Sequence, residues 1–284
     1  MGYTARDLPN SYTQDSMPLQ FQGPAWALSA DGLAAVTDTL GVQPPEIWAV
    51  LSVETFGCGY LPDRRPQILY ERHVFHRLTH GRFDDEGDIS AATPGGYGAR
   101  GAHQYLRLAA AIEKDRDAAL QSASWGIGQI MGANHVLAGF QSVEEMVTAM
   151  SESEDRQLAA MSSFLHGAGL RASLLAHDWA AFARGYNGPN YAANRYDVRL
   201  KQAFRKYSAG PSPDLTIRAA QLYLTYLGFR PGRIDGLAGT RTQAALAQFQ
   251  AQRELSGMEA IDATTVAQLI SALTAQAKAA TSAT

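Results

Sequence analysis

The sequence predicts a predominantly helical α+β protein made of one medium and one small unit. Helical apolar spacing recurs along most of the 284 residues, residues 56–101 interrupt it with many Gly and Pro, and a Pro/Gly/Ser stretch separates two helical patterns. We therefore expect five segments, namely an N-terminal arm at 1–27, a main domain at 28–207, a linker at 208–213, a small domain at 214–276 and a flexible tail at 277–284.

The main domain opens with two expected helices and a strand. A helix near 29–40 ends at Gly41, and Pro44 begins a second helix that runs to about Thr55, because proline is tolerated in the first helical turn. Residues 67–71 have the apolar and aromatic character of a strand. Together these elements predict a small β-region directly after the second helix.

Helices resume near 103–121 and continue to the linker. Ser142 and Glu145 have the spacing of a capping box, and Asp178 and Asn190 are expected to cap two further helices. Acidic residues in this part are expected on solvated helix faces, namely Glu144, Glu145, Glu152, Glu154 and Asp155.

Composition and charge argue against several classes of protein. Hydrophobic residues make up 46% and charged residues 18% of the chain, which is an ordinary globular composition. A net charge of −3 provides no basic surface for nucleic acid, and the single Cys58 excludes an internal disulfide. The sequence has no apolar run of about 18 residues and no signal-peptide core at its start, so we expect no membrane partner and no export signal.

Glu54 is an unusual residue for its position in the second helix. Ile47, Val50 and Leu51 form an apolar stripe, and Glu54 falls on the same stripe in the last helical turn. Burial and the negative end of the helix dipole should both raise its pKa, as a general acid near neutral pH requires. From the spacing alone, a structural ion pair with a nearby arginine explains Glu54 equally well.

Three ordered motifs give a stronger indication of function. Glu54-Thr55 ends an apolar helix, a Gly-rich segment follows as Ser124-Trp125-Gly126-Ile127-Gly128-Gln129-Ile130, and a third segment reads Ala183-Arg184-Gly185-Tyr186-Asn187-Gly188. The set resembles the lysozyme-like superfamily, in particular goose-type lysozymes, soluble lytic transglycosylases and phage endolysin muramidases. Residues 60–73 narrow the similarity to modular endolysins, and it covers most of residues 28–207.

The resemblance implies a lysozyme-like catalytic domain with a small β-region. Glu54 would be the catalytic acid, and the substrate-binding residues would be Ser124, Gly126, Gln129, Tyr186 and Asn187. The two glycines leave room for a sugar to approach the backbone, and the Gln129 amide offers donors and an acceptor. Trp125 is either a core residue or a sugar platform.

Glycosidases usually use a second carboxylate. Glu71 is the best candidate because it lies on the expected strand, and Asp63, Asp84, Asp85 and Glu86 are the alternatives. Goose-type lysozymes and lytic transglycosylases can work with one dominant Glu. The alternative role for Glu71 is therefore an ion pair with an arginine.

Three other patterns are set aside. His73, His76 and His80 can share a helical face but lack further ligands at metal-binding spacing, so we expect neither metal nor cofactor. Cys58 lies in a Gly-rich turn and not at a helix N-terminus that would activate it. Residues 96–101 match G-x-G-x-x-G without a preceding apolar strand, which indicates a flexible loop near the cleft.

The small domain predicts three short helices around a Gly-rich turn. Leu215, Ala219, Leu222 and Tyr226 share one helical face, a capping box is expected at Thr240–Gln243, and Asp262 is expected to cap the last helix. The segments Leu227-Gly228-Phe229, Gly232-Arg233-Ile234-Asp235-Gly236, Gly239-Thr240-Arg241-Thr242 and Phe249-Gln250 resemble the small peptidoglycan-binding domain of cell-wall hydrolases. The resemblance implies contacts from Asp235, Thr240 and Phe249, although the first two are equally explained as structural caps.

The sequence therefore predicts a monomeric endolysin that cleaves the β-1,4 bond between N-acetylmuramic acid and N-acetylglucosamine. We expect it in the host cytoplasm until lysis and then at the cell wall. Two alternatives remain: a lytic transglycosylase that leaves 1,6-anhydro ends, and a non-catalytic wall-binding virion protein.

Overall fold

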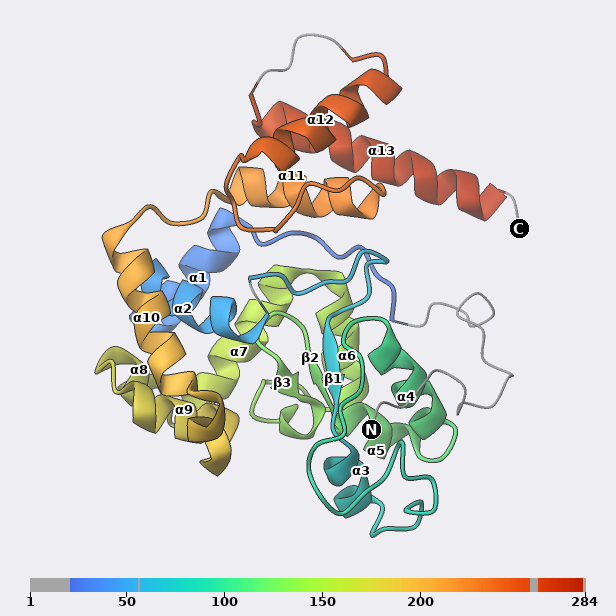
Figure 1. The fold of residues 1–284 in the computed structure, drawn as a ribbon, viewed down its shortest axis with the longest axis vertical. Coiled ribbons are helices and arrows are strands. Elements are labelled where there is room, and N and C mark those ends of the chain that lie inside the picture. The colour runs from blue at the N-terminus through green and yellow to red at the C-terminus, as the bar shows by residue number, and fades with distance from the viewer. Residues whose placement is uncertain (1–20, 56, 256–259, 283–284) are drawn as a thin grey trace.

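The computed structural model describes residues 21–55, 57–255 and 260–282. Residues 1–20 of the expected arm and residues 283–284 of the expected tail lie outside the described residues. The chain forms a larger helical body with one small sheet, and a three-helix unit lies against it (Figure 1).

Two helices build the first part of the larger body: α1 (Ala30–Leu40) and α2 (Pro44–Glu54). The Ser29 side chain caps α1 by accepting a hydrogen bond from Gly32, and Gly41 ends the helix in the left-handed conformation at φ 67°. Pro44 opens α2, where its missing N–H costs nothing. The stripe residues Ile47, Val50 and Leu51 are fully buried, as their spacing predicts.

The sheet has three short antiparallel strands in the order β1 (Ile68–Tyr70), β2 (Ala123–Trp125) and β3 (Ile130–Met131). Leu69 pairs with Ser124, and Trp125 pairs with Ile130. The Gly-rich motif is therefore the turn between β2 and β3, and the expected strand at 67–71 is its neighbour across the sheet.

Helices surround this sheet and complete the larger body. They are α3 (Arg72–Leu78), α4 (His103–Ile112), α5 (Arg116–Gln121), η1 (Gly132–Asn134), α6 (Val143–Glu152), α7 (Glu154–Gly167), α8 (Arg171–Leu175), α9 (Trp179–Asn187), η2 (Pro189–Asn194) and α10 (Tyr196–Ala209). The last of them, α10, packs along α2. Among the described residues, every helix is too short or too polar to cross a bilayer.

Several predicted helix ends are confirmed and others are wrong. Ser142 and Asp178 cap α6 and α9. The helices expected near 103–121 are α4 and α5, and the Asp115 side chain caps the second one by accepting a hydrogen bond from the Ala118 N–H. The cap expected at Asn190 is wrong, since this residue lies inside η2 and Arg195 precedes α10.

The small unit contains α11 (Leu215–Tyr226), α12 (Thr240–Gln252) and α13 (Ala263–Ser282). Asp262 caps the last helix by accepting a hydrogen bond from the Thr265 N–H. The capping box expected at Thr240 is wrong, because Gly239 is the N-cap and Thr240 already lies within the helix. Helix α13 also continues to Ser282, past residue 276, where the sequence predicts that the unit ends.

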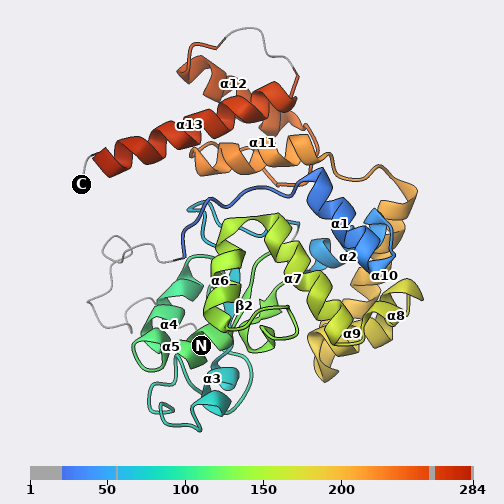
Figure 2. The same cartoon turned by 180° about the vertical axis from the view of Figure 1, so that it is seen from behind.

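The small unit is packed against the larger body along α11. In both views, the segment that leads into α1 runs between α11 and the ends of α6 and α7 (Figures 1 and 2). Ala25, Cys58 and Tyr60 of the larger body belong to the same buried cluster as Tyr223 and Phe249 of the small unit. The two units therefore share apolar core.

Candidate active site

Glu54 is the last residue of α2, and its position is fixed from three sides. Arg199 of α10 donates a hydrogen bond to the Val53 carbonyl at 3.0 Å. The Thr55 hydroxyl donates to the Ile127 carbonyl at 3.0 Å, which joins the end of α2 to the turn between β2 and β3. Asn187 at the end of α9 donates through Nδ2 to Oε1 of Glu54 at 3.0 Å.

The electrostatics of Glu54 favour its protonated form. Burial raises the pKa of this carboxyl from its ordinary value of 4.5 to about 7, although the Asn187 hydrogen bond and the charge of Arg199 lower it. As a residue, Glu54 is half-buried. A carboxyl that is half-protonated near pH 7 is suited to donate a proton to a bound substrate.

Tyr186 and Asn187 both lie beside Glu54. The Tyr186 hydroxyl donates to the Gly128 carbonyl at 2.5 Å, and its ring stacks on Phe182. The Oδ1 atom of Asn187 is buried and has no hydrogen-bond partner among the described residues, so its capacity to accept a hydrogen bond is unused there.

Gln129 and Ser124 brace the turn between β2 and β3. Gln129 Nε2 donates to the carbonyls of Gly126 and Gln67 at 2.8 and 3.2 Å, and its Oε1 accepts from the Ser124 hydroxyl at 2.9 Å. Gly126 has φ 71°, a conformation that favours glycine. The amide groups that the sequence suggests for sugar binding are thus engaged in holding the turn beside Glu54.

Trp125 is a core residue and not a sugar platform. Its side chain is fully buried, and the indole N–H donates to the Leu120 carbonyl at 3.1 Å. The sequence left open whether Trp125 is a core residue or a sugar platform, and the burial of its side chain excludes the platform.

Glu71 also has an unusual environment, at the junction of β1 and α3. Burial raises the pKa of its carboxyl to about 7, and a hydrogen bond from Tyr97 opposes the rise. Its Oε2 lies 3.2 Å from Nδ1 of His73, but the two buried atoms do not form a hydrogen bond. Burial and Arg77 lower the pKa of His73, so the imidazole is neutral near pH 7 and does not neutralise the carboxylate.

The four alternatives to Glu71 differ from it in burial. Asp63 forms an ion pair with Arg65, and Asp84 binds His76 and Ser90. Asp85 and Glu86 are exposed. Glu71 is thus the most buried of the five candidates for a second carboxylate.

Two tyrosines connect the surroundings of Glu54 and Glu71. Burial is the main cause that raises the pKa of both Tyr196 and Tyr97. The charge of Glu54 adds to the rise at Tyr196, and Glu71 and Tyr196 add to it at Tyr97. Tyr196 and Arg199 lie outside the motifs that the sequence singles out, and Tyr97 lies in the segment 96–101, which the sequence indicates only as a flexible loop.

The loop before α4, which the sequence predicts to be flexible, accepts hydrogen bonds from two side chains of α4. Gln104 is fully buried and donates to the carbonyls of Tyr97 and Ala99, each at 2.6 Å. Arg107 donates to the Gly96 carbonyl at 2.7 Å. These bonds fix Tyr97 next to Glu71.

The surroundings of Cys58 do not activate its thiol. Burial raises the pKa of the Cys58 thiol to about 12, which keeps it un-ionised and unreactive. Among the described residues, no group of three or more His, Cys, Asp or Glu is placed to hold a metal ion.

Comparison with known families agrees with this geometry. A family model for N-acetylmuramidase matches residues 43–208, more than half of the chain, and includes both Glu54 and Asn187. The chain belongs to the N-acetylmuramidase family. It is a glycoside hydrolase that acts on bacterial peptidoglycan. Residues 214–257 match a peptidoglycan binding domain, so peptidoglycan is both the substrate of the muramidase and the ligand of its C-terminal domain.

A solved structure supports the same assignment. The muramidase is 40% identical to the Burkholderia AP3 phage endolysin, with a TM-score of 0.58 over 64% of this chain and 71% of that one. No curated protein gives a significant match.

The three residues expected to bind the wall polymer lie in different settings of the C-terminal domain. Asp235 accepts hydrogen bonds from Gln221 and from the Leu237 N–H, which braces the Gly-rich turn. Thr240 is exposed at the start of α12. Phe249 is buried and borders a cavity of about 380 Å³ between α12 and α13, together with Phe229.

Proposed function

We propose that Glu54 is the general acid that protonates the glycosidic oxygen between N-acetylmuramic acid and N-acetylglucosamine. The observation that supports this best is that Asn187 holds the Glu54 carboxyl at the end of α2, where burial raises its pKa to about 7. Tyr186 and Asn187 orient this acid and face the substrate, and Ser124, Gly126 and Gln129 shape the turn against which the sugar lies. The buried and unpaired Oδ1 of Asn187 is suited to accept a hydrogen bond from an acetamido N–H.

Glu71 is proposed to assist as the second carboxylate. In its ionised form it would stabilise positive charge at the sugar ring or activate a water molecule. Glu71→Gln should lower kcat less than Glu54→Gln, because no leaving group depends on a proton from Glu71. An unchanged kcat in Glu71→Gln would leave Glu54 working alone.

The test of the central proposal is Glu54→Gln, with Glu113→Gln as a matched control on the exposed end of α4. We expect Glu54→Gln to stop the loss of turbidity of purified sacculi while pull-down by sacculi persists. The control should match the wild type in both assays. Equal lysis by Glu54→Gln would refute the proposal, and it would leave Glu54 as a structural residue.

The products distinguish hydrolysis from the alternative chemistry on the same fold. We propose that water attacks the sugar, so mass spectrometry of the released muropeptides should find reducing ends. Products with 1,6-anhydro-muramic ends would instead identify a lytic transglycosylase.

The biological role proposed here is that of a phage endolysin, made in the host cytoplasm and acting on the wall at lysis. The similarity to the AP3 phage endolysin supports it. Host cells that make the protein should lyse rapidly only when a separate pore-forming protein opens the inner membrane. We further propose a monomer that holds the wall through the cavity at Phe229 and Phe249.

A further inference from the structure

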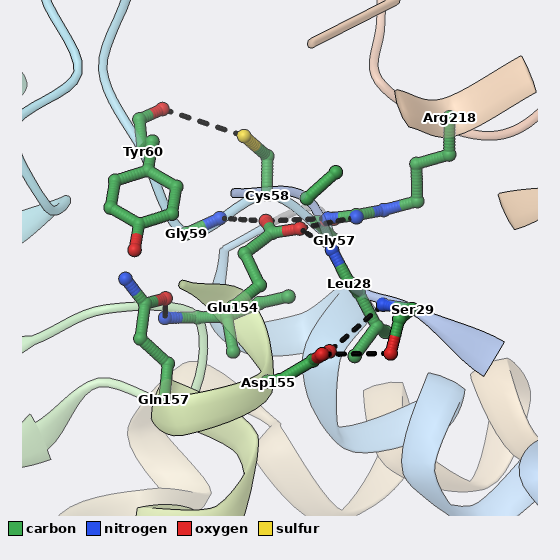
Figure 3. Close-up of polar contacts among 12 residues, drawn as sticks. Leu28, Ser29, Gly57, Cys58, Gly59, Tyr60, Glu154, Asp155, Gln157 and Arg218 are labelled. Atoms are coloured by element: carbon green, nitrogen blue, oxygen red, sulfur yellow. Dashed lines mark hydrogen bonds and ion pairs between the residues drawn. The ribbon is translucent and has the colours of Figure 1, made fainter. Parts of the chain in front are cut away.

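An arginine of the C-terminal domain is buried inside the catalytic domain. Arg218 of α11 is 1% exposed and pairs with Glu154 of α7, which is fully buried (Figure 3). Its Nη2 lies 2.7 Å from Oε1 of Glu154, and its Nη1 binds Oε2. This corrects the expectation that Glu154 lies on a solvated helix face.

The same ion pair holds the loop that follows the catalytic helix. Arg218 Nε donates to the Gly57 carbonyl at 3.0 Å, and the Gly59 N–H donates to Oε1 of Glu154 at 2.9 Å. The Gly57 N–H in turn donates to the Leu51 carbonyl in the last turn of α2. Both ends of residues 57–59, which begin three positions after Glu54, are therefore fixed by one buried pair (Figure 3).

Arg218 also contacts the catalytic helix itself. Its guanidinium carbon lies 5.9 Å from the centre of the Trp48 ring on α2, close enough for a cation–π contact. Both the body of α2 and the loop after it thus contact one side chain from the other domain.

A second polar side chain of α7 contacts the turn between β2 and β3. Gln157, one helical turn after Glu154, accepts a hydrogen bond from the Ile127 N–H at 2.7 Å. The Ile127 carbonyl accepts from Thr55, next to Glu54. Glu154 and Gln157 therefore join the loop after α2 to the turn between β2 and β3.

The surrounding contacts show that α11 is docked and does not hang from a free linker. The Tyr226 hydroxyl donates to the Ala25 carbonyl at 3.0 Å, and the Tyr223 hydroxyl accepts from the Ala27 N–H at 3.1 Å. Burying two charges is costly unless they pair closely and further hydrogen bonds satisfy their remaining donors and acceptors. Here the backbone N–H groups of Leu28 and Gly59 donate two further hydrogen bonds to Glu154. A domain that served only as a tether would not need such a pair.

We propose that Arg218 is a positioning residue of the muramidase site, and that the peptidoglycan-binding domain is a structural part of the catalytic unit. The inference rests on the proposed role of Glu54. It means that Arg218 supports turnover even on soluble glycan fragments, for which anchoring to an insoluble wall gives no advantage.

The experiment compares Arg218→Lys and Arg218→Met with Arg230→Met, an exposed arginine of the same domain that lies outside its binding motifs. Lysine keeps the charge but cannot bind Gly57 and both Glu154 oxygens at once, so the variant should fold without restoring the full contact. The readouts are kcat and KM on soluble, uncrosslinked peptidoglycan fragments, the alkaline limb of the kcat–pH profile, and pull-down by sacculi.

We expect kcat to fall by at least about tenfold in Arg218→Met and by less in Arg218→Lys, because small displacements of a catalytic group have effects of this size. The alkaline limb should also shift, since Glu54 would sit in a changed environment, whereas pull-down and the Arg230→Met control should match the wild type. A loss of kcat without a shift of that limb would mean general destabilisation and would overturn the inference.

Two further outcomes would also overturn it. The first is a folded Arg218→Lys whose kcat on soluble fragments equals that of the wild type, and it decides the question even if Arg218→Met does not fold. The second is a defect confined to sacculi, which would mean that the domain acts only as an anchor. Glu54→Gln is measured in the same assays. An inactive Glu54→Gln together with normal Arg218 variants would overturn only the inference about Arg218. An active Glu54→Gln would overturn the proposed function.

Discussion

Replacing Glu54 with glutamine should stabilise the protein, and the gain should grow with pH. In the unfolded chain this carboxyl ionises near its ordinary pKa of 4.5, whereas in the folded protein burial raises the pKa to about 7. Between these two pH values the folded state binds the proton more tightly. The free energy of unfolding therefore falls as the pH rises from about 4.5 to about 7, and it stays lower above that.

The size of the effect follows from the two pKa values. Each pKa unit corresponds to about 1.4 kcal/mol, so ionised Glu54 costs the folded state about 3 kcal/mol above pH 7. At pH 5 the unfolded carboxyl is only partly ionised, and the cost is about 1 kcal/mol. Glutamine keeps an acceptor for Asn187 and carries no charge. The stabilisation by Glu54→Gln should thus increase by about 2 kcal/mol between pH 5 and pH 8.

Urea unfolding of the wild type, Glu54→Gln and Glu113→Gln at pH 5 and pH 8 tests this expectation. Glu71 titrates over the same range, but it is present in all three proteins and cancels in the difference. Equal stabilisation at both pH values, or a loss of stability at pH 8, would refute the argument that Glu54 is held in an environment hostile to its charge.

Three further substitutions test other parts of the site. Trp125→Ala should lower the free energy of unfolding by about 3–5 kcal/mol, measured in urea, because it empties a fully buried position. Gly126→Ala should cost about 1–3 kcal/mol and reduce kcat, since φ is 71° and the new Cβ would lie 2.6 Å from the Gln157 side chain. Asn187→Leu should raise the pKa of Glu54, because it removes a hydrogen bond that favours the carboxylate, and the alkaline limb of the kcat–pH profile should move up by about 0.7 pH unit.

Each of these expectations has a contrary result. A stable Trp125→Ala with weakened sugar binding would return Trp125 to the role of a platform. Unchanged stability and kcat in Gly126→Ala would mean that the turn tolerates a side chain. A downward movement of the alkaline limb in Asn187→Leu would contradict the orientation of the Asn187 amide toward Glu54.

Local patterns predicted the elements that carry the site. The stripe of Ile47, Val50 and Leu51 predicted which face of α2 is buried, and Pro44 and Gly41 predicted where helices begin and end. These features depend on residues close in sequence, so helical spacing and turn chemistry are enough to find them.

Long-range pairings were beyond the sequence. Arg199 reaches the Val53 carbonyl from 146 positions away, and no spacing rule connects the two. Glu154 has the local pattern of a solvated acidic residue, and only the arrival of Arg218 from another domain explains its burial. Asn190 failed as a helix cap for a related reason: Pro189 starts a 3-10 helix that places Asn190 inside it.

The pairing of Arg218 with Glu154 also affects the order of events during synthesis. The ribosome makes the chain from its N-terminus, so every residue of the muramidase domain emerges before Arg218 and the rest of α11. Until then Glu154 lacks its Arg218 partner, and Ala25, Cys58 and Tyr60 lack the apolar partners from the small unit that cover them in the finished fold. If Arg218 positions the site as proposed, the site is completed only after the C-terminal domain has been translated.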